Sequence, residues 1–264
     1  MDEALITQYI ENVLQRDPRP GEVASWQAII DNNVQTLEEV LQAIIDSAEA
    51  VNEVYPMVLT YQAIYGRVPD AGGLDYWTNV YRANLSLDDA ATPTVNEALV
   101  EVLKAFVDPV KTPEFIDRYG ANPTGDQFVQ AAYFNVLNRT PDQAGLNYWQ
   151  DRYAEIEASY AGSGMTQEQI NVEVRAQILE QFVSSAEYKT AAGEEVDAFL
   201  TALANEDVIP VDQSLWDYTE IVAKTFDLTQ GSDTGPAFVG TDADDTYNGA
   251  AEQTAFLPIQ TLTD

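Results

Sequence analysis

The chain has 264 residues, of which 45% are hydrophobic and 10% aromatic, so it is long enough and apolar enough to fill a substantial core. Twelve Lys and Arg against 44 Asp and Glu give a net charge of −32, which repels nucleic acid and anionic membrane surfaces. Cys and His are both absent, which excludes thiol nucleophiles, imidazole bases and every metal site built from them. Carboxylate chemistry and oxygen-ligated calcium or magnesium sites remain open.

The first residues, "MDEALITQYI", show no basic region followed by an apolar stretch. Nowhere does the chain hold a continuous apolar run of the length that spans a bilayer. We therefore expect neither a Sec signal nor a membrane span.

Three phrases recur along the chain: "YIENVLQRDPRPGEVASWQAII" from Tyr9, "TYQAIYGRVPDAGGLDYWTNVY" from Thr60 and "AYFNVLNRTPDQAGLNYWQDRY" from Ala132. In each of them an Arg is followed at a fixed spacing by a Pro and then a Trp. These residues are Arg16, Pro18 and Trp26; Arg67, Pro69 and Trp77; and Arg139, Pro141 and Trp149. Such coincident spacings indicate an internal repeat.

Apolar residues before and after each Arg fall on one helical face, which predicts a helix, a proline turn and a second helix in each copy. Pro is expected to end the first helix because it lacks an N–H and disfavours helical geometry in the residue before it. Asp70 and Asp142 stand where an N-cap would satisfy free amides of the second helix.

Each copy then carries a phrase with Ser or Thr, any residue and Glu, in "SAEAVNEVY", "TPEFIDRYG" and "SAEYKTAAG", which fits a chain reversal closed by a short capped helix. The sequence therefore predicts a mainly α fold in which repeated helix-turn-helix units form a helical bundle. We assign residues 1–206 to this repeat domain, with copies near 5–56, 57–120 and 124–193. Residues 207–264 are rich in Gly, Asp and Thr, and are expected to form a β-type transition segment of loops and short strands.

The second and third copies, through "YGRVPDAGGLDYW" and "LNRTPDQAGLNYW", closely resemble the DUF4214 family, a helical repeat common in secreted bacterial proteins with calcium-binding RTX repeats. The resemblance covers roughly Thr60 to Ala192. The first copy is degenerate, because Arg19, Glu22 and Ser25 replace residues of the pattern.

The tail "FDLTQGSDTGPAFVGTDADDTYNGA" is similar to the entry into an RTX β-roll, which implies calcium binding. Asp242, Asp244 and Asp245 are the main candidate calcium ligands, since calcium accepts several oxygens in flexible geometry. The alternative for this segment is a solvated acidic linker. Asp70 and Asp142 are weaker candidate calcium ligands beside their role as N-caps.

The whole arrangement resembles the anchoring domain of surface-layer proteins exported by type I secretion. By analogy this implies an extracellular module that anchors a lattice to lipopolysaccharide O-antigen with calcium support, and it implies no enzymatic activity. One alternative is a scaffold whose repeats bind neighbouring copies to build a lattice. Another is an accessory domain of a secreted polysaccharide-modifying enzyme.

Two kinds of repeated residue are candidate glycan contacts. Tyr76 and Tyr148 are candidates because each stands next to a Trp. The Trp is expected in the core, while the adjacent Tyr points away from it and offers a face on which a sugar can stack. Arg67 and Arg139 are expected mainly to tie loop carbonyls or the cap carboxylate through a guanidinium fork, and alternatively to bind an anionic sugar.

Overall fold

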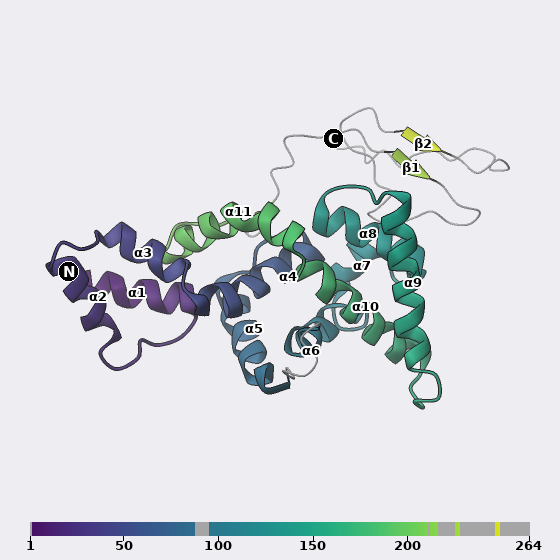
Figure 1. The fold of residues 1–264 in the computed structure, drawn as a ribbon, viewed down its shortest axis with the longest axis horizontal. Coiled ribbons are helices and arrows are strands. Elements are labelled where there is room, and N and C mark those ends of the chain that lie inside the picture. The colour runs from purple at the N-terminus through teal and green to yellow at the C-terminus, as the bar shows by residue number, and fades with distance from the viewer. Residues whose placement is uncertain (1, 88–94, 211, 216–224, 228–245, 249–264) are drawn as a thin grey trace.

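A computed structural model describes residues 2–87, 95–210, 212–215, 225–227 and 246–248, and over these residues the protein is mainly helical (Figure 1). The helices are α1 (Asp2–Leu14), α2 (Glu22–Asp31), α3 (Leu37–Ile45), the π-helix η1 (Ala50–Val54), α4 (Tyr55–Tyr65), α5 (Ala71–Asn84), the 3-10 turn η2 (Leu85–Leu87), α6 (Glu97–Phe106), α7 (Pro113–Tyr119), α8 (Gly125–Leu137), α9 (Gln143–Ser159), α10 (Gln167–Val183) and α11 (Ala186–Ala204). None of the helices in these ranges is long and apolar enough to cross a membrane.

Local sequence explains where several helices begin. A capping box opens three of them, in which the Thr hydroxyl accepts the N–H three residues on and the Glu or Gln there accepts the Thr N–H. The pairs are Thr36 with Glu39, Thr124 with Gln127, and Thr166 with Gln169. Each box satisfies amides that the first turn of a helix otherwise leaves without partners.

The three Arg-Pro-Trp phrases lie at the junctions of α1 with α2, α4 with α5, and α8 with α9. From the sequence we expected the Pro to end the first helix of each pair, but the helix ends earlier. It ends two residues before the Arg, and the residue between them adopts left-handed backbone geometry: Gln15 at φ 51°, Gly66 at φ 70° and Asn138 at φ 49°. A left-handed residue reverses the chain direction and places the Arg on the turn, so the Pro only shapes the path into the next helix.

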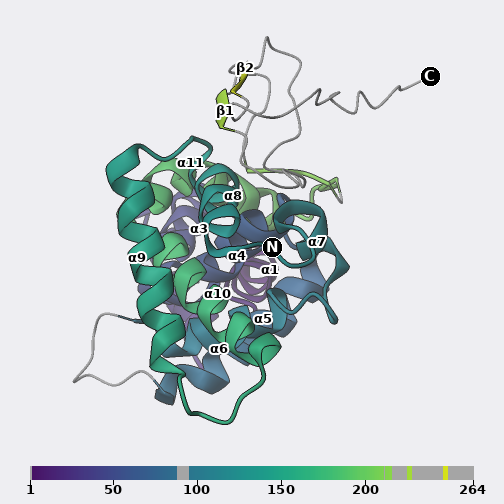
Figure 2. The ribbon, with the colours of Figure 1, turned by 90° about the vertical axis from the view of Figure 1, so that its right-hand side faces the viewer.

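The core runs through the whole helical body, with α4 at its centre (Figure 1). Met57, Val58, Ala63 and Ile64 of α4 are completely buried. α4 packs against α5, α7, α8, α10 and α11, while α1, α2 and α3 form one end of the molecule. In the view turned by 90°, α9 runs alongside α10 (Figure 2).

The last long helix returns to the first. α11 packs against α1 and α3, and two side chains of α1 donate to carbonyl oxygens at the end of α11. Gln8 Nε2 lies 2.7 Å from the Ala204 oxygen, and Asn12 Nδ2 lies 3.2 Å from the Leu203 oxygen. The helical body is therefore closed on itself.

The described residues after α11 pack on the turn between α4 and α5. Val68 N donates to the Gln213 oxygen at 2.7 Å, and Leu215 N donates to Gln62 Oε1 at 2.7 Å. Leu215 is buried. Beyond it, β1 (Thr225–Asp227) and β2 (Thr246–Asn248) pair in parallel, with Phe226 opposite Tyr247.

Most of the expected transition segment lies outside the described residues. The same holds for the three predicted calcium ligands Asp242, Asp244 and Asp245.

Candidate functional site at the helix turns

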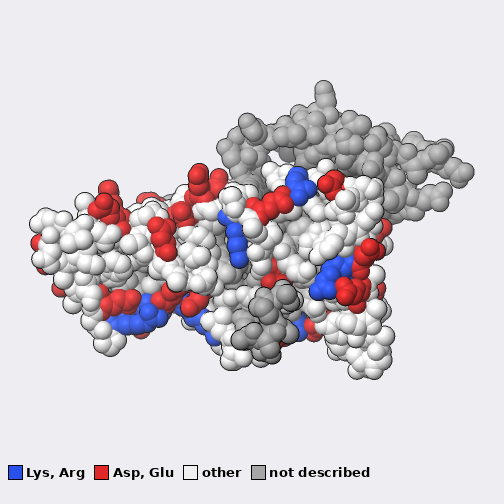
Figure 3. Space-filling model, in the orientation of Figure 1, with Lys and Arg blue, Asp and Glu red and all other residues white. Residues whose placement is uncertain are grey.

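The surface of the described chain is strongly acidic, and its cations stand beside acids. On the face drawn in Figure 3, most of the Lys and Arg side chains lie against Asp or Glu side chains. Most of the described cations form ion pairs with Asp or Glu: Arg16, Arg19, Arg67, Arg82, Lys104, Lys111, Arg139 and Arg152. Positive charge is therefore largely neutralised within the protein.

The repeated arginines join each turn to the Glu of the later Ser/Thr-x-Glu phrase. Arg67 donates from Nη2 and Nε to Glu114 Oε1 at 2.9 and 3.2 Å, and from Nη1 to its neighbour's carbonyl, the Val68 oxygen, at 3.3 Å. Arg139 donates from Nε to Glu187 Oε1 at 2.6 Å, from Nη2 to Glu187 Oε2 at 3.0 Å and from Nη1 to the Thr140 oxygen at 3.4 Å. We call this arrangement the Arg–Glu clamp.

The clamp confirms that the guanidinium fork ties a loop carbonyl, but its carboxylate partner was missed. We expected the cap aspartate, whereas the partner is a Glu nearly fifty residues later in the chain. A signal for it was present, because the Arg and the Glu recur in the same copies. Sequence spacing alone did not show that the two meet.

The first copy keeps the clamp and extends it. Arg16 donates to Glu49 Oε1 at 2.6 Å and to both oxygens of Glu22 at 2.8 and 2.9 Å. Its hydrogen bonds lower the pKa of Glu22 to about 2 and also lower the pKa of Glu49. Arg82 joins the same group through Glu49 and Glu53. What reads as degeneracy in the sequence is a larger ion-pair network in the structure.

Gly73 and Gly145 occupy the position that Glu22 holds in the first copy, and a tyrosine explains why. A Cβ added to Gly73 would lie 2.5 Å from the Tyr61 hydroxyl oxygen, and one added to Gly145 would lie 2.5 Å from that of Tyr133. Only Gly leaves room for such an approach. The first copy has Ile10 in place of the tyrosine, so its turn can carry the Glu22 side chain instead.

Asp70 and Asp142 are helix N-caps, as predicted. Asp70 Oδ1 accepts from Gly73 N at 2.8 Å, and Asp142 Oδ1 accepts from Gly145 N at 2.6 Å. Within the residues that the structure describes, no group of three Asp or Glu side chains gathers around either one. These two carboxylates do not by themselves provide the six to eight oxygens that calcium takes.

Tyr76 and Tyr148 reach the surface, with 59% and 58% of each residue exposed. Each ring meets the neighbouring Trp edge-on, with centroids 4.9 Å apart for Tyr76 and Trp77 and 5.2 Å apart for Tyr148 and Trp149. The tryptophans are only partly buried. They pack on the core through Phe106 and Phe182, at centroid distances of 4.6 and 4.4 Å.

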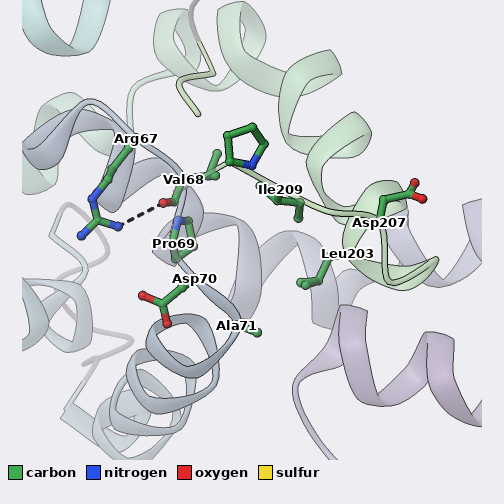
Figure 4. A pocket seen from close by; sticks show the side chains of 9 residues that line it. Arg67, Val68, Pro69, Asp70, Ala71, Leu203, Asp207 and Ile209 are labelled. Atoms are coloured by element: carbon green, nitrogen blue, oxygen red, sulfur yellow. Dashed lines mark hydrogen bonds between the residues drawn. The ribbon is translucent and has the colours of Figure 1, made fainter. Parts of the chain in front are cut away.

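The turn between α4 and α5 forms one wall of a cavity of about 470 Å³ (Figure 4). Residues 67–71 line this wall, and Leu203, Asp207, Ile209 and Pro210 line the other. The structure thus brings Arg67 and Asp70, two sequence-predicted site residues, to a common cavity, with Asp207 across from them. Arg139 and Asp142 occupy the corresponding turn between α8 and α9.

The cavity combines apolar walls with a few fixed polar groups. Val68, Pro69 and Ile209 provide the apolar surface, while the Arg67 guanidinium is held in place by Glu114. Asp70 uses Oδ1 for capping, and its second oxygen accepts no hydrogen bond from the residues that the structure describes, so it can accept one from a ligand. Such a mixture is typical of sites for small polar ligands.

Comparison with protein families finds a match for this chain. The family model described as "Domain of unknown function (DUF4214)" matches residues 1–54 and 107–192, just over half of the chain. It includes the first and third Arg-Pro-Trp phrases and leaves out residues 55–106, which hold the second, so its extent differs from the expected Thr60 to Ala192. No curated protein matches the chain.

Proposed function

This chain belongs to the DUF4214 family, and from that premise we propose that it is a cell-surface anchoring module that binds a polysaccharide such as lipopolysaccharide O-antigen. The observation that carries the proposal is the cavity at the Arg67 turn, with Tyr76 exposed on the helix that begins there. The proposed module is not catalytic and acts outside the cell.

The chemistry of the cavity suits a sugar residue. Sugars offer hydroxyl groups that pair with carboxylate and guanidinium groups, and C–H faces that pack on apolar or aromatic surfaces. Asp70 and Arg67 supply the polar partners, and Val68 and Ile209 supply apolar surface. Because Glu114 holds Arg67, a ligand does not have to immobilise that side chain on binding.

A second contact point supports a polymeric ligand. Tyr148 repeats the exposure of Tyr76 and its edge-on contact with a Trp. A polysaccharide with repeating units can engage equivalent groups on two copies at once, so that weak contacts add up to firm attachment.

Calcium and export belong to the same proposal. We assign calcium to Asp242, Asp244 and Asp245, in the segment that resembles the entry into an RTX β-roll. Asp70 and Asp142 are left as helix caps. Type I secretion and assembly in a surface layer rest on the resemblance of the whole arrangement.

The test is binding of purified lipopolysaccharide, measured in calcium and after chelation. Ala71→Phe places a ring at the cavity wall and should weaken binding at least about tenfold, because it removes the space for a sugar. Gln143→Phe is the matched control, since it changes the same position of the third copy. Absence of binding in calcium, or equal loss with both variants, would contradict the proposal.

A further inference from the structure

A second, smaller hollow of about 140 Å³ lies where the π-helix η1 meets α4, α5, α6, α10 and α11. Val51 and Asn52 come from the π-helix η1, and Lys189 comes from the first turns of α11. Pro56, Leu99 and Val183 add apolar surface from α4, α6 and α10. A π-helical turn inside a helical run is frequently found at functional sites, and here it brings Asn52 to the rim.

Most polar groups of the hollow already have partners. Asn96 Nδ2 donates to the Tyr81 hydroxyl at 2.7 Å, while Asn96 N and Ser184 Oγ donate to Glu180 Oε1 at 3.2 and 2.8 Å. The side chains of Asn52 and Lys189 differ, because neither hydrogen-bonds to any residue that the structure describes. Both residues are exposed and line the hollow, so they bring an amide and an ammonium group to its rim.

Lys189 stands apart from the other cations in the described ranges of the chain. Most of those are in ion pairs. The two others, Arg118 and Arg175, donate to the side-chain oxygens of Asn135 and Asn122. Only Lys189 has neither kind of partner among described residues, in a chain with 44 acidic residues. Its charge is available to an anion that comes from outside.

We propose that the Lys189 hollow binds the carboxylate of an acidic sugar residue, such as a uronate, within the polysaccharide. The inference rests on the proposed function and names the class of glycan. The volume accommodates a carboxylate and the carbon that carries it, while the apolar residues pack on the C–H face of the ring. The Glu180 carboxyl group lies behind Asn96 and Ser184, which disfavours a more highly charged phosphate.

The experiment measures binding of a galacturonate trisaccharide to the whole chain by calorimetry at about 0.15 M salt, which screens repulsion from the net negative charge of the protein. Lys189→Met should weaken binding about tenfold, because a hydrogen bond to a charged group is lost. Asn52→Ala should weaken it by a smaller factor of about threefold to fivefold. Lys111→Met is the matched control, since Lys111 is exposed and pairs with Asp108 away from the hollow, and it should leave binding unchanged.

Two further probes make the result decisive. Maltotriose, which lacks a carboxylate, should not distinguish wild type from Lys189→Met. Inorganic phosphate that binds as tightly as the uronate would overturn the assignment to a carboxylated sugar. Equal binding of the uronate by wild type and Lys189→Met would overturn the site itself.

Failure here is separable from failure of the proposed function. Lipopolysaccharide binding that is lost in Ala71→Phe but kept in Lys189→Met would leave the anchoring proposal standing and would remove only the uronate site. The melting temperature of each variant provides the folding control. The melting temperature of Lys189→Met is expected to equal that of the wild type, because the Lys189 ammonium group forms no hydrogen bond or ion pair with a described residue.

Discussion

Gly145→Ala tests whether the tyrosine sets the shape of the third turn. Alanine in a helix is ordinarily about 0.5–1 kcal/mol more favourable than glycine. Here the new Cβ would lie 2.5 Å from the Tyr133 hydroxyl oxygen and 3.1 Å from Asp142 Oδ1. Overpacking of this kind costs about 1–3 kcal/mol, so we expect a net loss of up to about 2.5 kcal/mol in the free energy of unfolding.

Urea denaturation of four variants checks this reasoning. Tyr133→Phe removes the hydroxyl oxygen, so Gly145→Ala should cost much less in that background than in the wild type. Gly193→Ala is the control, because its Cβ meets nothing within 4 Å and should stabilise α11 by about 0.5–1 kcal/mol. The reasoning is refuted if Gly145→Ala stabilises the protein as much as Gly193→Ala does, or if Tyr133→Phe brings no relief.

Three other predictions concern the turns. The pKa of Glu22 is lowered from 4.5 to about 2, so its pair with Arg16 stabilises the fold fully above about pH 4.5 and loses that effect as the pH falls toward 2. Glu22→Gln should therefore reduce the loss of stability that urea unfolding measures between these pH values. An unchanged pH dependence would refute this. Arg16→Met should cost about 2 kcal/mol and Arg139→Met below about 1 kcal/mol, because Arg139 and its partner are more exposed; equal melting temperatures would contradict the ranking. Asp142→Ala should cost about 1 kcal/mol by loss of the N-cap, seen as faster amide exchange at Gly145.

Local features were predicted well from the sequence. The paired helices around each Arg, the N-caps at Asp70 and Asp142, and the exposed positions of Tyr76 and Tyr148 all follow from periodicity and capping rules that act within a few residues. These rules need no knowledge of which helices come together. Capping rules also favour left-handed geometry at Gly66 and Asn138, but they could not place it in the first copy, since Gln15 carries no strong preference for it.

The parts of the candidate site that were missed depend on distant contacts. Arg67 meets Glu114 only because α7 packs against α4, and the cavity exists only because the chain after α11 returns to the Arg67 turn. Copy-to-copy comparison held the clue to the first of these, because Arg and Glu recur together. Comparison of the copies gave no clue to the cavity, since Leu203 and Ile209 follow the last copy and have no counterpart in the other copies.

The contact between the first and last helices also bears on how the chain is made. Gln8 and Ala204 are separated by 196 positions, so α1 leaves the ribosome long before the residue that its side chain will contact has been added. In an open array of repeats, each unit can settle on the one before it during synthesis. Here the apolar face of α1 is not fully covered until α11 has been synthesised. This favours slow completion of folding after translation and gives chaperones time to bind the exposed N-terminal helix.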